Sequence, residues 1–198
     1  MIHPGTELKY IRKEIGYGVV ATQFIPKGTI TWVLDSLDRK FTHREVESLG
    51  PNYTNIIDTY GFRDAEGNYI LCWDHARFVN HSFDPSCITT AYDFELAVKD
   101  IYPGDELMND YGTLNIGEPF HCVLEPGSNR KLVLPDDLLH YYRDWDKKLI
   151  GAFKNLQKVS QPLFKYLDEP AQKKAIAIAQ EECEMDSILS CYLYNSHK

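Results

Sequence analysis

The pattern of apolar and polar positions changes once along the chain, near Pro135. Before that residue, runs of β-branched and aromatic residues are short, and turns rich in glycine and proline separate them. Such runs are typical of short β-strands. The pattern predicts strands over 19–25 and 29–34, a hairpin from 60–62 and 69–73, and a strand pair within 88–99. Residues 1–13 are expected to form only a short lead.

Three segments have helical patterns. In 42–58, Thr42 and Glu45 have the spacing of a capping box, and Gly50-Pro51 is expected to stop the helix. After Pro135 an apolar face recurs every three or four residues, at Leu138, Tyr142, Trp145, Leu149, Phe153 and Leu156. Sequence rich in Ala, Gln and Lys predicts a further helix over roughly 170–190. The fold class predicted is therefore mainly β with appended helices.

Composition limits the classes of partner. The 198 residues are 43% apolar and 25% charged, which is ordinary for one domain with an appendage. The net charge of −8 argues against general nucleic-acid binding, which needs a basic surface. The same charge is compatible with a cationic ligand or a lysine-rich protein partner.

The five cysteines form no CxxC pair, and an odd number without a tight spacing suits a reducing compartment. No apolar run approaches the length that crosses a membrane, and no secretion signal is recognised. A cytoplasmic protein is expected, or a nuclear one if the source is eukaryotic.

A dense polar cluster, Asn80-His81-Ser82, directly follows the apolar pair Phe78-Val79. Buried amide, imidazole and hydroxyl groups all need partners, so the cluster predicts a chain that leaves a strand and turns against other backbone. A simple loop, in which Asn and Ser satisfy their own turn, is the alternative.

Other chemistries fit less well. Gly16-Tyr17-Gly18 begins a G-x-G-x-x-A match to the dinucleotide fingerprint, but no apolar strand precedes it and β-branched residues follow it. His81 and Ser82 lack the G-x-S-x-G elbow of a hydrolase. The spacing of the possible metal ligands matches no familiar zinc pattern; these are Cys72, His75, His81, Cys87, His121 and Cys122.

Three stretches, taken in order, resemble the motifs of one family. They are 16–22 with the turn 25–28, 77–82 with 85–87, and 106–112 after the turn 103–105. In this order and at these intervals they resemble the SET domain, a family of protein-lysine methyltransferases that use S-adenosylmethionine (AdoMet). The resemblance covers about residues 5–120. Residues 121–198 are then a post-SET segment and a C-terminal helical extension.

The resemblance implies a β-clip fold of small sheets in which the Asn80 segment joins the Tyr111 segment in a pseudoknot. It implies that AdoMet is held by Gly16, Tyr17, Gly18, Asn80, His81 and Phe120. Tyr111 would be the catalytic tyrosine, and Tyr60 and Asn109 would lie in the substrate channel.

The chain also departs from many relatives, which bind zinc through the Cys87 position and three later cysteines. Only Cys122 is added here, so no metal is expected. The apolar turn at 123–127 or the tail helices are expected to close the site instead. Asn109 stands where many relatives carry a Phe or Tyr that controls how many methyl groups are added, which leaves that number open.

Two functions are compatible with these residues. An enzyme would transfer methyl groups to the ε-amine of a protein lysine, a displacement in which positioning matters most and an aromatic channel favours the neutral amine. A non-catalytic SET-like module would bind a protein partner, which Asn109 and the missing cysteines favour. The intact Gly16, Asn80 and Tyr111 favour the enzyme. In either case the partner is a lysine-bearing protein, with no direct contact to nucleic acid or membrane.

Overall fold

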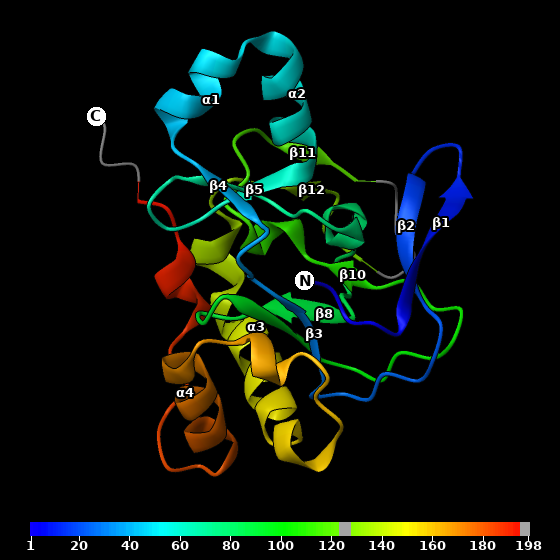
Figure 1. The fold of residues 1–198 in the computed structure, drawn as a ribbon, viewed down its shortest axis with the longest axis vertical. Coiled ribbons are helices and arrows are strands. Elements are labelled where there is room, and N and C mark those ends of the chain that lie inside the picture. Colours follow the sequence, from blue (N-terminus) through cyan, green and yellow to red (C-terminus); the bar gives the residue numbers. More distant parts are fainter. Residues whose placement is uncertain (123–127, 195–198) are drawn as a thin grey trace.

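The fold comes from a computed structural model that describes residues 1–122 and 128–194 (Figure 1). The strands are β1 Thr6–Arg12, β2 Gly16–Ala21, β3 Ile30–Val33, β4 Arg39–Phe41, β5 Gly61–Arg63, β6 Tyr69–Leu71, β7 Asn80–His81, β8 Cys87–Thr89, β9 Phe94–Ala97, β10 Met108–Asn109, β11 Phe120–His121 and β12 Leu132–Val133. The helices are α1 His43–Leu49, α2 Pro51–Tyr60, α3 Asp137–Phe153 and α4 Glu169–Ala179. Short 3-10 turns are η1 His75–Phe78, η2 Tyr111–Thr113, η3 Leu156–Lys158, η4 Phe164–Tyr166 and η5 Ile188–Cys191.

The strands form several small sheets rather than one large sheet. β1 pairs with β2, β9 lies between β3 and β8, and β6 lies between β4 and β5, all antiparallel. In Figure 1 the β1–β2 hairpin stands at one edge, α1 and α2 at the top, and α3 and α4 below. The predicted class, mainly β in small sheets with helices at the carboxyl-terminal end, is confirmed.

Two distant segments pair in parallel at the centre of the molecule. β7 aligns Asn80 with Met108 and His81 with Asn109 on β10. The Ser82 N–H donates to the Asn109 carbonyl at 2.9 Å, which continues the pairing. The polar cluster at 80–82 is therefore not a free loop, because its backbone is held by the segment that leads into Tyr111.

The helical segment at 42–58 has the predicted cap and the predicted break. The Glu45 N–H donates to Thr42 Oγ1, and the Thr42 N–H donates to the Glu45 carboxylate, which completes the capping box. Gly50, with φ of +80°, ends α1, and Pro51 starts α2 at once. Glycine adopts a positive φ without a side-chain clash, and proline is favoured in the first turn of a helix, so Gly50-Pro51 separates the two helices.

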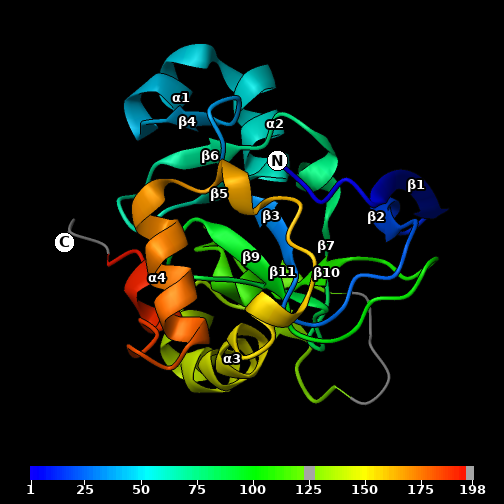
Figure 2. The ribbon, with the colours of Figure 1, turned by 60° about the horizontal axis from the view of Figure 1, so that its bottom comes forward.

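The tail shares its core with the β domain. The predicted apolar face of α3 buries Leu138, Trp145, Leu149 and Phe153 in a cluster that also contains Phe94 of β9. α4 lies against α3 on the same side of the molecule (Figure 2). The tail is thus part of the main hydrophobic core, and its removal would expose the β3-β9-β8 sheet.

The strand expected over 19–25 begins earlier and ends at Ala21. Two other elements differ more from prediction. Residues 1–13 were expected to be a lead, but Thr6–Arg12 is a strand whose side chains are mostly exposed, so its order comes from pairing with β2 and no apolar alternation marks it. The helix expected over 170–190 ends at Ala179, and Glu181 follows in the left-handed region with φ of 59°. Acidic residues at a helix carboxyl end oppose the helix dipole, which favours a stop there.

In the described part of the chain, no helix has the length and apolar character needed to cross a membrane.

Candidate functional site

The glycine turn at 16–18 is fastened to both other motifs by one amide. Asn80 Nδ2 donates to the Tyr17 carbonyl at 3.0 Å and to Glu106 Oε1 at 2.6 Å. A Cβ at Gly18 would lie 2.9 Å from Asn80 Nδ2, so only glycine lets that amide approach the turn. The three stretches singled out in the sequence therefore meet at this amide.

His81 is buried and neutral. Burial, together with the positive charge of Arg130, lowers the pKa of His81 to about 4. The Tyr111 N–H donates to His81 Nδ1 at 3.1 Å, so in the neutral ring the proton lies on Nε2. That Nε2 is buried and has no hydrogen-bond partner among residues 1–122 and 128–194. It is therefore a buried donor without an acceptor among the described protein atoms.

The depressed pKa of His81 predicts a loss of stability in acid. Between pH 6.5 and 4 the unfolded chain binds a proton at this residue and the folded chain does not, so the free energy of unfolding falls as pH falls through this window, by up to about 3 kcal/mol. His81→Asn keeps an acceptor for the Tyr111 N–H and is expected to flatten this part of the curve. Urea unfolding at pH 4, 5, 6 and 7 measures it.

The matched control is His140→Asn, which removes an exposed histidine of α3 paired with Asp136. Its pH curve is expected to follow the unmodified protein. Equal slopes for all three proteins between pH 4 and 6.5 would contradict the assignment of His81 as a buried neutral ring.

Tyr111 contacts both sides of the site. Its hydroxyl donates to the Val79 carbonyl at 2.9 Å, and its ring lies 5.3 Å from His81 and 5.4 Å from Phe120. Burial, and then the nearby Glu106 carboxylate, raise the pKa of the Tyr111 phenol well above its ordinary value. The hydroxyl is therefore a neutral hydrogen-bonding group and not a base.

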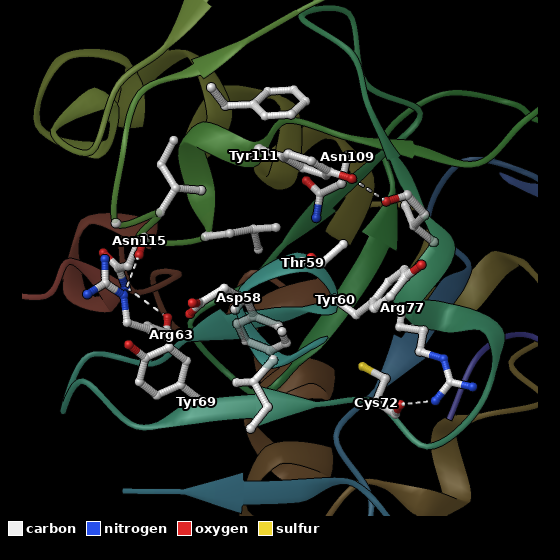
Figure 3. Close-up of a pocket in the computed structure, with 18 of the residues that line it drawn as sticks. Asp58, Thr59, Tyr60, Arg63, Tyr69, Cys72, Arg77, Asn109, Tyr111 and Asn115 are labelled. Carbon is white, nitrogen blue, oxygen red and sulfur yellow. Dashed lines mark hydrogen bonds between the residues drawn. The ribbon is translucent and has the colours of Figure 1, made fainter. Parts of the chain in front are cut away.

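A cavity of about 590 Å³ opens on one side of Tyr111 (Figure 3). Much of its wall is aromatic, from Trp32, Tyr60, Phe62, Tyr69, Tyr111 and Phe120. Figure 3 shows Asn109 next to the Tyr111 ring, facing the same space as Tyr60. An aromatic wall suits an aliphatic chain and can stabilise a cation.

The predicted site residues thus divide into two groups that meet at Tyr111. Tyr60, Asn109, Tyr111 and Phe120 line the cavity. The other five, Gly16, Tyr17, Gly18, Asn80 and His81, lie outside its lining. The Asn80 amide holds the glycine turn, and His81 is joined to the cavity wall through the Tyr111 N–H.

A family model of the SET domain matches residues 16–112, the interval that contains the glycine turn, the Asn80 pair and Tyr111. The chain carries a SET domain. The SET family is one of protein-lysine methyltransferases that generally use AdoMet. The matched interval lies within the predicted 5–120 domain, and the division at residue 120 stays a prediction.

Among solved structures, this chain is similar to a Plasmodium falciparum protein named "putative histone methyltransferase". The two chains are 18% identical, and the match covers 56% of this chain and 95% of the other with a TM-score of 0.41. No curated protein sequence matches the chain.

The segment after the SET domain is held by a cluster that the sequence analysis missed. The Arg130 guanidinium pairs with Asp110 and with Asp137, each at 2.5 Å, and stacks on Phe83 and Tyr141. We call these five residues the arginine clamp. Asp110 directly precedes Tyr111, and Asp137 begins α3, so the clamp ties the Tyr111 segment to the tail.

No sequence pattern pairs these charges, since about 20 residues separate Arg130 from Asp110. In the described part of the chain, no three His, Cys, Asp or Glu side chains are placed to hold a metal ion. Cys87 is buried, and Cys122 is partly exposed. The turn at 123–127, expected to close the site, lies outside the described residues, whereas the tail helix α3 does reach the site through the clamp.

Glu95 is the second residue that was missed. It lines the cavity and accepts hydrogen bonds from Asn109 Nδ2 at 2.6 Å and from Thr89 Oγ1 at 3.3 Å. Burial raises the pKa of Glu95 to about 7. One signal was available: Glu95 interrupts an apolar strand between Phe94 and Leu96, and alternation along a strand directs it away from the face that carries these two side chains.

Proposed function

We propose that the protein transfers methyl groups from AdoMet to the ε-amine of a protein lysine. The observation that carries the proposal is the place of Tyr111 between the motif residues and an aromatic cavity. Its N–H bonds to His81 on one side, while its ring forms part of the cavity wall on the other.

The motif residues outside the cavity lining, together with Phe120, fit AdoMet. The buried Nε2 of His81 offers a donor without a protein partner, and the neighbouring Phe120 offers a ring for a flat ligand. Gly16 has φ of +86°, and the space where its Cβ would lie is open. We infer that Gly16, Tyr17, Gly18, Asn80, His81 and Phe120 hold AdoMet, which supplies an electrophilic methyl group when bound.

The residues that line the cavity fit a lysine side chain. Aromatic rings cover its methylene groups and exclude water, which disfavours the charged amine and lowers its pKa. The neutral Tyr111 hydroxyl and the Val79 carbonyl are then positioned to orient the reacting groups. Placement therefore supplies most of the rate enhancement in this proposal.

A binding module without catalysis is the second candidate, because Asn109 lines the cavity at the position where many SET relatives carry Phe or Tyr. A cytoplasmic location remains part of the proposal, and the five free cysteines are compatible with it.

The proposal predicts that the protein binds AdoMet with a Kd in the micromolar range, the usual order for such ligands. Gly16→Val is expected to weaken that binding at least tenfold, because a side chain enters the space beside the turn and forces a φ that valine avoids. Titration calorimetry measures both.

The matched control is Gly104→Val, which places the same side chain at a φ of +92°, also in open space but in the turn between β9 and β10. It is expected to lose similar stability and to keep its AdoMet affinity. A flat titration at millimolar AdoMet would refute the cofactor. AdoMet binding without transfer of a radiolabelled methyl group to lysine-rich proteins would favour the binding module.

A further inference from the structure

The cavity contains an acid that the proposed function leaves unused. Glu95 is one of the cavity residues, together with Asn109 and Tyr111. Cross-strand pairing places it opposite Trp32 of β3, whose indole also lines the cavity. A carboxylate is therefore present within a largely aromatic space, which is costly unless the charge has a partner.

The hydrogen bonds of Glu95 hold one of its oxygen atoms. Both of its donors among the described residues, Asn109 Nδ2 and Thr89 Oγ1, bond to Oε1. These bonds fix the direction of the carboxyl group. Among the described residues, Glu95 forms no salt bridge. A cation entering the cavity would supply the missing counter-charge.

The other ionisable groups near Glu95 do not replace such a cation. Its charge helps to raise the pKa of the Tyr111, Cys72 and Cys87 side chains, all of which are neutral groups at pH 7. The positive charge of the Met1 amino group lowers the pKa of Glu95 from the other side of β3, but this amino group is itself paired with Asp35. The remaining charges that line the cavity are Asp58, Arg63, Arg77 and Glu118.

Both arginines of the cavity already have oxygen partners. Arg63 Nε donates to the Asn115 carbonyl at 2.9 Å, and Arg77 donates to the Cys72 carbonyl. Figure 3 shows them at opposite sides of the cavity, away from Asn109. Neither is bonded to Glu95, so the carboxylate is available for a ligand.

We propose that Glu95 binds the substrate amine as a cation and accepts its proton, so that the amine is neutral when it reacts. This inference rests on the proposed function. In the step, one N–H bond of the alkylammonium breaks and one O–H bond forms on Glu95, giving a neutral amine and a neutral carboxylic acid. No oxidation state changes, and the carboxylic acid returns its proton to water before the next substrate binds.

The protonation equilibrium of Glu95 suits this role. A carboxyl group with a pKa of about 7 is ionised for much of the time at neutral pH and is basic enough to share a proton with a desolvated amine. At pH 5 the carboxyl is already protonated and is not an acceptor. The rate of transfer should therefore rise with pH through about 7.

The test compares the full chain with Glu95→Gln, which keeps the shape and an oxygen acceptor but removes the charge. The control is Asp93→Asn, the same chemical change two residues away at a carboxyl outside the cavity lining whose pKa burial also raises. Asn tolerates the left-handed φ of 58° at that position. Thermal unfolding shows whether each variant folds.

Two readouts are used. For methyl transfer, Glu95→Gln is expected to lower kcat/KM about 100-fold at pH 7.5 and to remove the inflection of the pH profile near pH 7. The difference from the unmodified protein should become smaller toward pH 10, where the substrate ammonium loses its proton to solvent. For binding, calorimetry with n-butylammonium chloride in the absence of AdoMet is expected to show affinity that rises from pH 6 to 8. Glu95→Gln should weaken it at least tenfold, and Asp93→Asn should change neither readout.

Thr89→Val keeps a β-branched side chain but removes a hydrogen bond that lowers the pKa of Glu95, so the inflection should move to higher pH. It tests the inference even if Glu95→Gln does not fold. If these variants transfer methyl groups with unchanged pH profiles and bind n-butylammonium with unchanged affinity, the role of Glu95 is refuted and the proposed function is not. If AdoMet does not bind at all, the proposed function fails, and the n-butylammonium titration still decides whether Glu95 recognises an amine.

Discussion

Tyr111→Phe is expected to lower methyl transfer at least 100-fold while AdoMet binding changes less than twofold. The variant removes one hydroxyl, whose described bond is to the Val79 carbonyl, and leaves the ring against His81 and Phe120. Losing a preorganised hydrogen-bonding group at a reaction centre costs about 100- to 1000-fold in rate. The same loss costs stability only about 1 kcal/mol.

Single-turnover transfer from radiolabelled AdoMet separates the chemical step from binding, and calorimetry measures the affinity. The control is Tyr102→Phe, which removes the hydroxyl of an exposed tyrosine in the turn before β10. If Tyr111→Phe transfers methyl groups at the rate of the control, Tyr111 is a structural tyrosine and not a catalytic one.

Arg130→Met is expected to lower the free energy of unfolding by about 3–5 kcal/mol, the usual cost of leaving buried charges without their partner. Asp110 and Asp137 are almost fully buried, with side-chain exposures of 0% and 3%. Methionine keeps much of the contact with Phe83 and Tyr141, so the fall in the free energy of unfolding comes mainly from removing the guanidinium charge. Urea unfolding at pH 7.5 measures it.

Arg143→Met is the control, since Arg143 stacks on Tyr142 of the same helix and forms none of the clamp's bonds. It is expected to cost less than 1 kcal/mol. Adding Asp110→Asn and Asp137→Asn to Arg130→Met should recover part of the loss, because the uncompensated charges are gone. A cost for Arg130→Met below 1 kcal/mol would mean that the clamp does not hold the tail to the SET domain.

The clamp also links stability to catalysis. Asp110 accepts the Gly112 N–H at 3.0 Å and so caps the 3-10 turn that contains Tyr111. Without Arg130, the Asp110 side chain is no longer fixed in the orientation that accepts the Gly112 N–H. We therefore expect the methyl-transfer rate of Arg130→Met to fall along with its stability, a relation that a purely peripheral ion pair would not produce.

Local patterns predicted the elements whose order depends on near neighbours. The capping box of Thr42 and Glu45 and the hairpin of β5 and β6 form as expected, because each is decided within about ten residues. The helical apolar face after Pro135 is equally local. The order and spacing of three motifs were sufficient for the SET family, although their meeting at the Asn80 amide is visible only in the fold.

Sequence alone therefore specified the capping box of Thr42 and Glu45, the apolar face of α3 and the motif residues, since these depend on residue type and short spacing. Folding in three dimensions decided that Thr6–Arg12 is a strand, because its order comes from a partner strand rather than from burial of its own side chains. It also decided that Arg130 meets Asp110 and that Glu95 is a weak acid inside a cavity. Charge pairing and desolvation depend on distances between atoms in space, and residues far apart in the chain carry no local sign of them.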